Sequence, residues 1–230
     1  MKPHLSVYWC IPPKQNGEFV ARMEDILELY CLPYDPCIPL VCMDEQSRQL
    51  IKETRIPLPA IPGKPKRVDY EYERNGNANI FLFVEPLAGW RHVNVRERRT
   101  SVDWAHEIKE LPEVHYPQAP LVRLVCDNLN THKIGSLYEA FEPKQARLIA
   151  KRLDIHYTPK HGSWLNVAEL ELSVLTRQCL DRRIPDIDTL HSETQSWEHT
   201  RNEKQKGVDW QFTTDDARIK LKTLYPQVHM

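Results

Sequence analysis

Hydrophobic positions at the start of the chain follow first a helical and then a strand pattern. In residues 16–30 the apolar side chains recur at spacings of three and four, with prolines outside both ends, which predicts an amphipathic helix. The apolar run that follows predicts a buried strand over residues 36–46, in which Asp44 ends the apolar part. The prolines of residues 53–65 interrupt regular hydrogen bonding and predict an extended loop.

Two strands and a turn are predicted next. Residues 68–74 and 78–85 have strand character, and the sequence Asn75-Gly76-Asn77 between them predicts a hairpin turn. Residues 89–96 alternate well enough to predict a third strand.

Helices and strands alternate through the rest of the chain. A helix capped by Ser101 and ending at residue 111 comes first, followed by a strand over residues 119–127 that ends at Asp127. A helical segment over residues 134–153, interrupted near Pro143, and a strand over residues 154–158 come next. The chain then continues with a long helix over residues 166–183 and two helical segments on either side of residues 210–212. Mixed sheets with helical crossovers have this order of elements. If the predicted strands over residues 36–46 and 119–127 pair in parallel, Asp44 and Asp127 become neighbours, and the topology is an RNase H-like mixed α/β sheet flanked by helices. The predicted division is an N-terminal linker and helix over residues 1–35, a catalytic domain over residues 36–185 and a C-terminal helical extension over residues 186–230.

Composition is that of an ordinary globular protein. The 230 residues are 41% hydrophobic and 27% charged, and no internal repeat is apparent. No apolar stretch approaches the length of a membrane span, and the first residues lack the apolar core of a signal peptide. These features predict a cytoplasmic protein without a membrane partner.

Cysteine pattern and charge narrow the chemistry further. The six cysteines form no Cys-x-x-Cys pair, so we expect reduced and mostly buried thiols and no structural metal. The net charge of -1 argues against indiscriminate coating of DNA, but basic residues cluster locally, as at Arg177, Arg182 and Arg183. Such a cluster is either a solvated surface or a set of phosphate contacts.

Three acidic residues suggest a metal site. Asp44 and Asp127 each end the apolar run of a predicted strand, and Glu169 opens a predicted helix. Carboxylate oxygens are the ligands that Mg²⁺ prefers, and two such ions, roughly 3.5–4 Å apart, promote phosphoryl transfer in many nucleases. The alternatives are aspartates that form turns, and a Glu169 that acts with Asn166 as a variant of a helix capping box. Apolar periodicity does not separate Glu169 from Glu171, because each lies on one flank of the helix.

A family resemblance adds to this reading. The sequence His161-Gly-Ser-Trp-Leu-Asn-Val-Ala-Glu169, together with Asp44-Glu-Gln and Asp127-Asn-x-x-x-His132, resembles the catalytic half of bacterial insertion-sequence transposases of the mariner superfamily. These are DDE transposases. The segments around Trp197, Arg201 and Trp210 resemble the end of such proteins. In that family the third carboxylate follows an asparagine by three positions, which selects Glu169 over Glu171.

The resemblance implies an activity, cofactors and partners. The expected reactions are DNA cleavage at transposon ends and strand transfer into a target, for which the resemblance implies TA. The expected catalyst is a homodimer whose Asp44, Asp127 and Glu169 hold two Mg²⁺ ions, with Mn²⁺ as a substitute. A nucleoid location in a bacterial cytoplasm would follow. Asn128 and Asn166 are the expected supporting residues. The candidates for DNA contact are His132, His161, Trp164, Arg177, Arg182 and Arg183.

Two departures from the family are visible, and two rival functions remain. The gap between Asp127 and Glu169 is longer than is typical, and the helix-turn-helix region that recognises transposon ends is expected to be missing from this chain. One rival is an RNase H-like nuclease that only cuts DNA, such as a junction resolvase. The other is a split or decayed transposase fragment that binds DNA or regulates complete subunits.

Overall fold

The structure, a computed structural model, describes residues 14–227 of the chain. The first 13 residues of the predicted N-terminal segment, which include Cys10, and the last three residues of the predicted C-terminal extension lie outside the described part.

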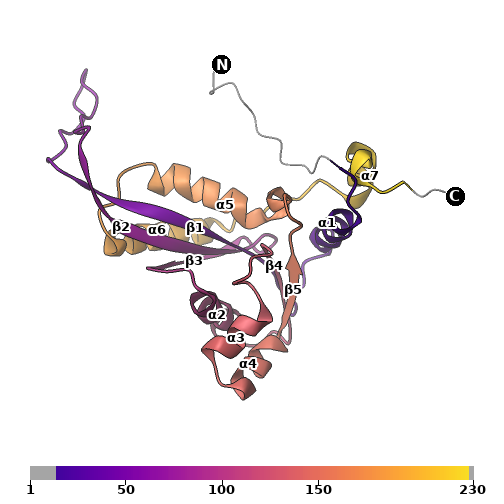
Figure 1. The fold of residues 1–230 in the computed structure, drawn as a ribbon. Helices are drawn as coiled ribbons and strands as arrows, with labels where there is room; N and C mark the ends of the chain where they lie inside the picture. Colours follow the sequence, from indigo (N-terminus) through magenta and orange to yellow (C-terminus); the bar gives the residue numbers. More distant parts are fainter. Residues whose placement is uncertain (1–13, 228–230) are drawn as a thin grey trace.

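A five-stranded mixed sheet forms the centre of the molecule (Figure 1). Its strands are β1 (Leu40–Glu53), β2 (Tyr72–Glu85), β3 (Trp90–Arg96), β4 (Val122–Cys126) and β5 (Leu153–Tyr157), in the order β3-β2-β1-β4-β5. The pairs β1–β2 and β2–β3 are antiparallel, whereas β1–β4 and β4–β5 are parallel. The predicted RNase H-like topology, with the first and fourth strands in parallel, is therefore confirmed.

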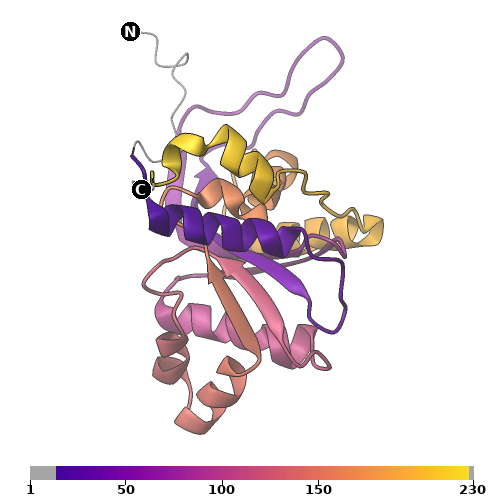
Figure 2. The ribbon, with the colours of Figure 1, turned by 90° about the vertical axis from the view of Figure 1, so that its right-hand side faces the viewer.

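Helices cover both faces of this sheet (Figures 1 and 2). One core contains α2 (Ser101–Glu110), α3 (Ile134–Ala140) and α4 (Pro143–Ala150), and the other contains α1 (Gly17–Tyr30), α5 (Val167–Leu175), α6 (Ile187–Lys204) and α7 (Thr214–Lys220). Strand residues alternate between the two cores, so that Cys42 packs with the second set of helices and Met43 with the first.

The predicted hairpin at Asn75-Gly76-Asn77 is wrong. Residues 72–85 form one continuous strand, and the register against β1 shifts where Gln49 pairs with Asn77 and Ile51 with Arg74. Gly76 has a φ of 86°, which suits a β-bulge as well as a tight turn. The true hairpin joins β1 to β2 through residues 54–71, the arm, which projects from the body of the protein (Figures 1 and 2). The predicted extended loop is the first part of this arm.

Strand β1 is longer than predicted. Asp44 does not end it, because pairing with β2 continues to Glu53 after the pairing with β4 stops at Cys42. Asp44 thus lies within a strand but beyond the end of the parallel pair.

Helix boundaries also differ from the predictions. Thr100, not Ser101, is the N-cap of α2, because its side chain accepts from the amide of Asp103 and the Asp103 carboxylate accepts in return. The predicted helix over residues 166–183 is shorter, since α5 passes into a π-helical turn, η4 (Thr176–Leu180). The interruption near Pro143 is confirmed, because this proline begins α4.

The described cysteines are free thiols, but they are not all buried. Cys42 and Cys126 are buried and Cys179 is partly buried, whereas Cys31 and Cys37 are exposed, so the prediction of buried thiols fails for these two. Within residues 14–227, no helix is both long and apolar enough to cross a membrane.

Helix α6 covers the edge strand β3. The side chain of Asn202 accepts from the Arg91 amide at 2.8 Å and donates to the Arg91 carbonyl at 2.7 Å. The Glu198 carboxylate accepts from the Val93 amide at 2.7 Å. Side chains of α6 thereby satisfy backbone groups that an open sheet edge would leave for another chain.

Candidate active site

Two aspartates meet where the parallel strands end. The pairing of β1 with β4 stops at Cys42 and Val125, and Asp44 and Asp127 each follow by two positions. Because side chains two apart in a strand share a face, the two carboxylates lie on the same side of neighbouring chain segments. Burial and, after it, the nearby charge of Asp127 raise the pKa of Asp44, as expected for two carboxyl groups that lie close to each other.

Glu169 comes to this edge from the first turn of α5. Asn166 is the N-cap of that helix, since its side-chain oxygen accepts from the Ala168 amide at 3.1 Å. Its side-chain nitrogen donates to the Met43 carbonyl at 2.9 Å. The cap is thus confirmed, but Glu169 does not close a capping box with Asn166.

Glu171 has a different environment from Glu169. It is 4% exposed, and its carboxylate accepts from Arg91 at 2.9 Å and from Arg201 at 2.8 Å. Two guanidinium groups therefore neutralise Glu171 in the core, whereas Glu169 lines a surface cleft together with Asp44. This arrangement leaves Glu169 as the carboxylate that faces the aspartates.

The cleft has a volume of about 350 Å³. Its lining residues are Asp44, Glu45, Gln46, Glu169, Leu172, Ser173, Thr176 and Arg177. Arg177 is exposed and places a positive charge in an otherwise acidic cleft, where it could meet a phosphate.

Burial and mutual repulsion disfavour the charged forms of these three acids. Burial, followed by the charge of Asp127, raises the pKa of Asp44 to about 8. Burial also raises the pKa of Asp127, and burial with the charge of Asp127 raises the pKa of Glu169. The Oδ1 atom of Asp127 is buried and has no hydrogen-bond partner among the described residues. Carboxylate oxygens at one end of the parallel strands are the ligands that hard divalent ions such as Mg²⁺ prefer.

His132 supports the site from inside the protein. Its side chain is completely buried and stacks on Trp104 at a centroid distance of 5.5 Å, so the prediction that it contacts DNA is wrong. Its Nδ1 atom lies 3.1 Å from the Asp127 carbonyl oxygen and its Nε2 atom 2.9 Å from the Glu45 carboxylate. A carbonyl only accepts, so Nδ1 carries a proton, and the ring holds the chain just after β4 against β1.

Glu45 is a site residue that the sequence reasoning missed. Its side chain is 3% exposed and pairs with His132, although it neighbours Asp44 in the sequence. The only sequence feature that pointed to Glu45 was its position directly after Asp44. Strand alternation places its side chain on the opposite face from Asp44 but does not predict that a buried partner lies there.

Most of the other predicted DNA contacts lie outside the cleft lining. His161 is exposed and has a φ of 66°, which is unusual for a residue with a side chain. Trp164 is partly buried against the core and packs on Phe212 in a T-shaped arrangement at a centroid distance of 5.9 Å, so a core role accounts for its position and its contact with DNA stays a prediction. Asn128, which was expected to support the site rather than to contact DNA, is exposed and accepts a hydrogen bond from Lys133.

Arg182 and Arg183 already have acidic partners. Arg182 is exposed and pairs with Glu193 at 2.5 Å. Arg183 pairs with Glu53 at 2.5 Å and lies over the ring of Tyr72. A phosphate would have to compete with these contacts.

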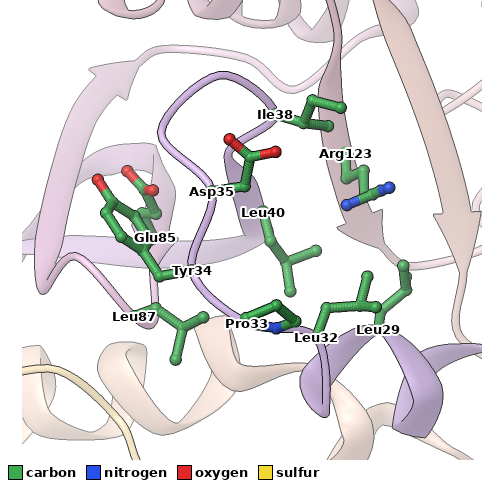
Figure 3. A pocket seen from close by; sticks show the side chains of 10 residues that line it. All are labelled: Leu29, Leu32, Pro33, Tyr34, Asp35, Ile38, Leu40, Glu85, Leu87 and Arg123. Carbon is green, nitrogen blue, oxygen red and sulfur yellow. The ribbon is translucent and has the colours of Figure 1, made fainter.

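A second, small hollow lies at the opposite edge of the sheet (Figure 3). Leu40 and Arg123 line it where β1 and β4 begin, and Glu85 lines it where β2 ends. Its volume of about 10 Å³ has room for one water molecule, so we do not regard it as a substrate site.

Comparison with solved structures supports the fold. The mariner Mos1 paired-end complex with Mg matches 99% of this chain and 69% of its own with a TM-score of 0.57 and 13% identity. The match to the Mos1 paired-end complex with Mn covers 90% of this chain and 62% of the Mos1 chain, with a TM-score of 0.56 and 14% identity. The match to the catalytic domain of Mos1 transposase covers 86% of this chain and 96% of that domain, with a TM-score of 0.50 and 9% identity.

These likenesses concern the fold alone, because the identities are low. The chain spans 62% of the length of the Mos1 chain in the Mn complex. A search of curated protein sequences gave no match. The family model of the DDE superfamily endonucleases matches residues 39–191, which contain Asp44, Asp127 and Glu169. This match covers well over half of the sequence, and the chain therefore belongs to the DDE superfamily endonuclease family.

Proposed function

We propose that this chain is the catalytic part of a DDE transposase, which hydrolyses a phosphodiester bond at a transposon end and joins the freed 3′-hydroxyl to target DNA. The observation that carries the proposal is the convergence of Asp44, Asp127 and Glu169 at the carboxyl edge of the parallel strands. All three lie inside the segment that matches the DDE endonuclease family.

Asp44, Asp127 and Glu169 would hold two Mg²⁺ ions, or Mn²⁺ in their place. Such ions, when bound, activate the attacking oxygen and stabilise the leaving one. The protein's own contribution is position: Asn166 fixes the start of α5 against β1, and His132 fixes the chain after β4. Neither residue needs to touch DNA for this role.

DNA would lie across the cleft and contact its rim. Arg177 is the first candidate for a phosphate contact, since it lines the cleft and forms no ion pair with another described residue. His161 is a second candidate because it is exposed and precedes the η3 turn (Ser163–Leu165) next to Asn166. Arg182 and Arg183 would reach DNA only by giving up Glu193 and Glu53.

A second copy of the chain is the proposed protein partner in the active complex. The arm exposes apolar side chains that this copy does not cover, with Ile56 93%, Leu58 61% and Tyr70 85% exposed. Apolar surface of this kind is typical of an interaction site. The Mos1 structures with which the chain shares its fold are paired-end and strand-transfer complexes, which suits an assembly with more than one copy.

Finer assignments rest on the sequence resemblance. These are membership of the bacterial insertion-sequence branch, a TA target and a location at the nucleoid. The division into a catalytic domain over residues 36–185 and an extension over residues 186–230 also stays a proposal, in which α6 packs on β3 and α7 on α1.

A nuclease assay on supplied transposon-end DNA tests the proposal. Asp44→Asn, Asp127→Asn and Glu169→Gln should each abolish Mg²⁺-dependent cleavage while circular dichroism shows a retained fold. Asp209→Asn, an exposed aspartate outside the cleft, is the matched control and should cleave normally. Cleavage without strand-transfer products would favour a nuclease that only cuts. Absence of both activities in the wild type, on DNA that it binds, would favour a regulatory fragment.

A further inference from the structure

We infer a second metal site, separate from the proposed active site, in which His92, Glu110 and His115 bind one zinc ion. His92 belongs to β3, Glu110 is the last residue of α2, and His115 is the last residue of the π-helical turn η2 (Leu111–His115) that follows α2. One nitrogen from each histidine and one oxygen from the glutamate all lie within 4.8 Å of one another. The topology thus brings three metal-binding groups from two parts of the chain to one point.

These donors have no other partner. The Nε2 atoms of His92 and His115 are both buried and unpaired among the described residues. Burying a polar atom without a hydrogen bond costs free energy, so two such atoms side by side require an explanation. Glu110 likewise forms no ion pair within residues 14–227, although its helix neighbour Lys109 pairs with Glu113.

The histidine rings are oriented from outside the cluster. Nδ1 of His92 lies 3.4 Å from one oxygen of Glu198, whose other oxygen accepts from the Val93 amide. This bond uses Nδ1 and leaves the unpaired Nε2 as the nitrogen available to a metal, which is the usual role of a carboxylate behind a metal-binding histidine. Trp90 packs against the ring of His115 at a centroid distance of 5.0 Å and limits its rotation.

The donor set selects the metal. Two imidazole nitrogens and one carboxylate oxygen form a common zinc set, whereas Mg²⁺ prefers oxygen ligands alone. All three residues are partly buried, but the two Nε2 atoms themselves are not exposed, so a water molecule would have to enter beside them to complete the coordination as a fourth ligand. An ion here would link the edge strand β3 to the junction of α2 and η2.

This site is on the other face of the sheet from Asp44. His92 pairs with Phe83 across β3 and β2, and Phe83 pairs with Met43 across β2 and β1. Since neighbouring residues in a strand point to opposite faces, Asp44 points away from the row that His92 continues. The inference therefore does not depend on the proposed DNA cleavage.

Zinc titration calorimetry on the full chain provides the test. The Asp44→Asn, Asp127→Asn double variant, in excess Mg²⁺, removes binding at the proposed active site. We expect one Zn²⁺ per chain. Removing a residue that only orients a metal ligand typically lowers metal affinity by roughly 10–100-fold, and removing the ligand itself should lower it further. His92→Gln and His115→Gln should therefore each weaken zinc binding by more than about 100-fold. Glu198→Gln should weaken it by about 10–100-fold.

His199→Gln is the matched control, because His199 is on α6, is 78% exposed and lies outside the cluster. It should bind zinc as before. Unchanged affinity in folded His92→Gln and His115→Gln variants would overturn the inference, as would the absence of any Zn²⁺ binding in the double variant. If the histidine variants fail to fold, Co²⁺ added to the double variant decides the matter. Visible absorption typical of a four-coordinate ion is expected, and its absence would refute the site.

Discussion

The side-chain amide of Asn166 donates a hydrogen bond of 2.9 Å to the carbonyl of Met43. Met43 immediately precedes Asp44, and Asn166 begins the helix on which Glu169 occupies the first turn. A single buried side chain therefore fixes the distance between two proposed metal ligands that are far apart in the sequence. The same side chain caps α5, so its loss should affect both stability and the site.

Asn166→Ala should reduce the free energy of unfolding and abolish most cleavage. Loss of the cap costs about 0.5–2 kcal/mol, and leaving the buried Met43 carbonyl unpaired costs about 1–3 kcal/mol. Urea denaturation and the nuclease assay measure the two effects. Asn16→Ala is the matched control, because Asn16 caps α1 by accepting from Phe19 at 3.1 Å. It should lower stability through the cap alone and leave cleavage intact, and an equal loss of activity would show that Asn166 acts only through stability.

Divalent metal should stabilise the folded protein through the acidic cluster. Ligand binding to the folded state alone adds about 2.7 kcal/mol at a hundredfold excess over Kd. We expect Mg²⁺ or Mn²⁺ to raise the melting temperature of the wild type in a scanning-calorimetry series, and Asp44→Asn to reduce the shift. An equal shift in both proteins would mean that the ion binds elsewhere.

The metal-free protein should become less stable as pH rises from about 4 to 8. Burial raises the pKa of Asp44 to about 8 in the folded state, whereas an unfolded aspartate titrates near 3.9. The stabilising contribution of the neutral carboxyl is complete below the unfolded pKa and is lost as pH rises through the folded one. In a chelator, melting temperatures across this range should fall less in Asp44→Asn than in the wild type. Asp209→Asn should follow the wild type, and a parallel fall in all three proteins would contradict the assignment.

Glu171→Gln should destabilise the fold without removing a proposed metal ligand. Arg91 and Arg201 would keep buried charges with no carboxylate, and breaking such a pair costs about 3–5 kcal/mol. We expect a lower midpoint in urea but retained cleavage at temperatures where the variant stays folded. Glu203→Gln, which removes an exposed pair with His199, should change stability by less than about 1 kcal/mol. Loss of cleavage in folded Glu171→Gln would reopen the choice of Glu169.

DNA binding by this chain alone should be weak, indifferent to sequence and sensitive to salt. Phosphate contacts of this kind give dissociation constants of about 10⁻⁴–10⁻⁶ M at physiological salt. The logarithm of the binding constant should fall linearly with the logarithm of the salt concentration, and Arg177→Gln should lower the magnitude of this salt slope by about 1. Fluorescence anisotropy across a salt series measures this slope. Replacing Arg182 and Arg183 together should lower it by less than 2, because both already pair with glutamates. A preference above roughly a thousandfold for the end sequence would show that the chain recognises transposon ends itself.

Local sequence determined the elements and their order. Periodicity located α1, β4 and the pair α3 and α4, because amphipathic spacing depends only on which residues face the core. The order also suited parallel pairing between the strands that carry Asp44 and Asp127, which the structure confirms as the pair β1–β4. The cap at Asn166 could also be predicted, since capping involves residues three apart or fewer.

Tertiary structure alone decided the features that depend on distant partners. Gly76 permits either a turn or a bulge, and pairing with β1 made it a bulge. Glu169 and Glu171 flank the same helix, and only the positions of Arg91 and Arg201 gave them different environments. From the sequence, His132 could be expected to contact DNA, but in the structure it is buried against Glu45 and Trp104. Sequence spacing specifies the direction of a side chain within its own element, whereas burial and charge pairing depend on which other elements pack against it.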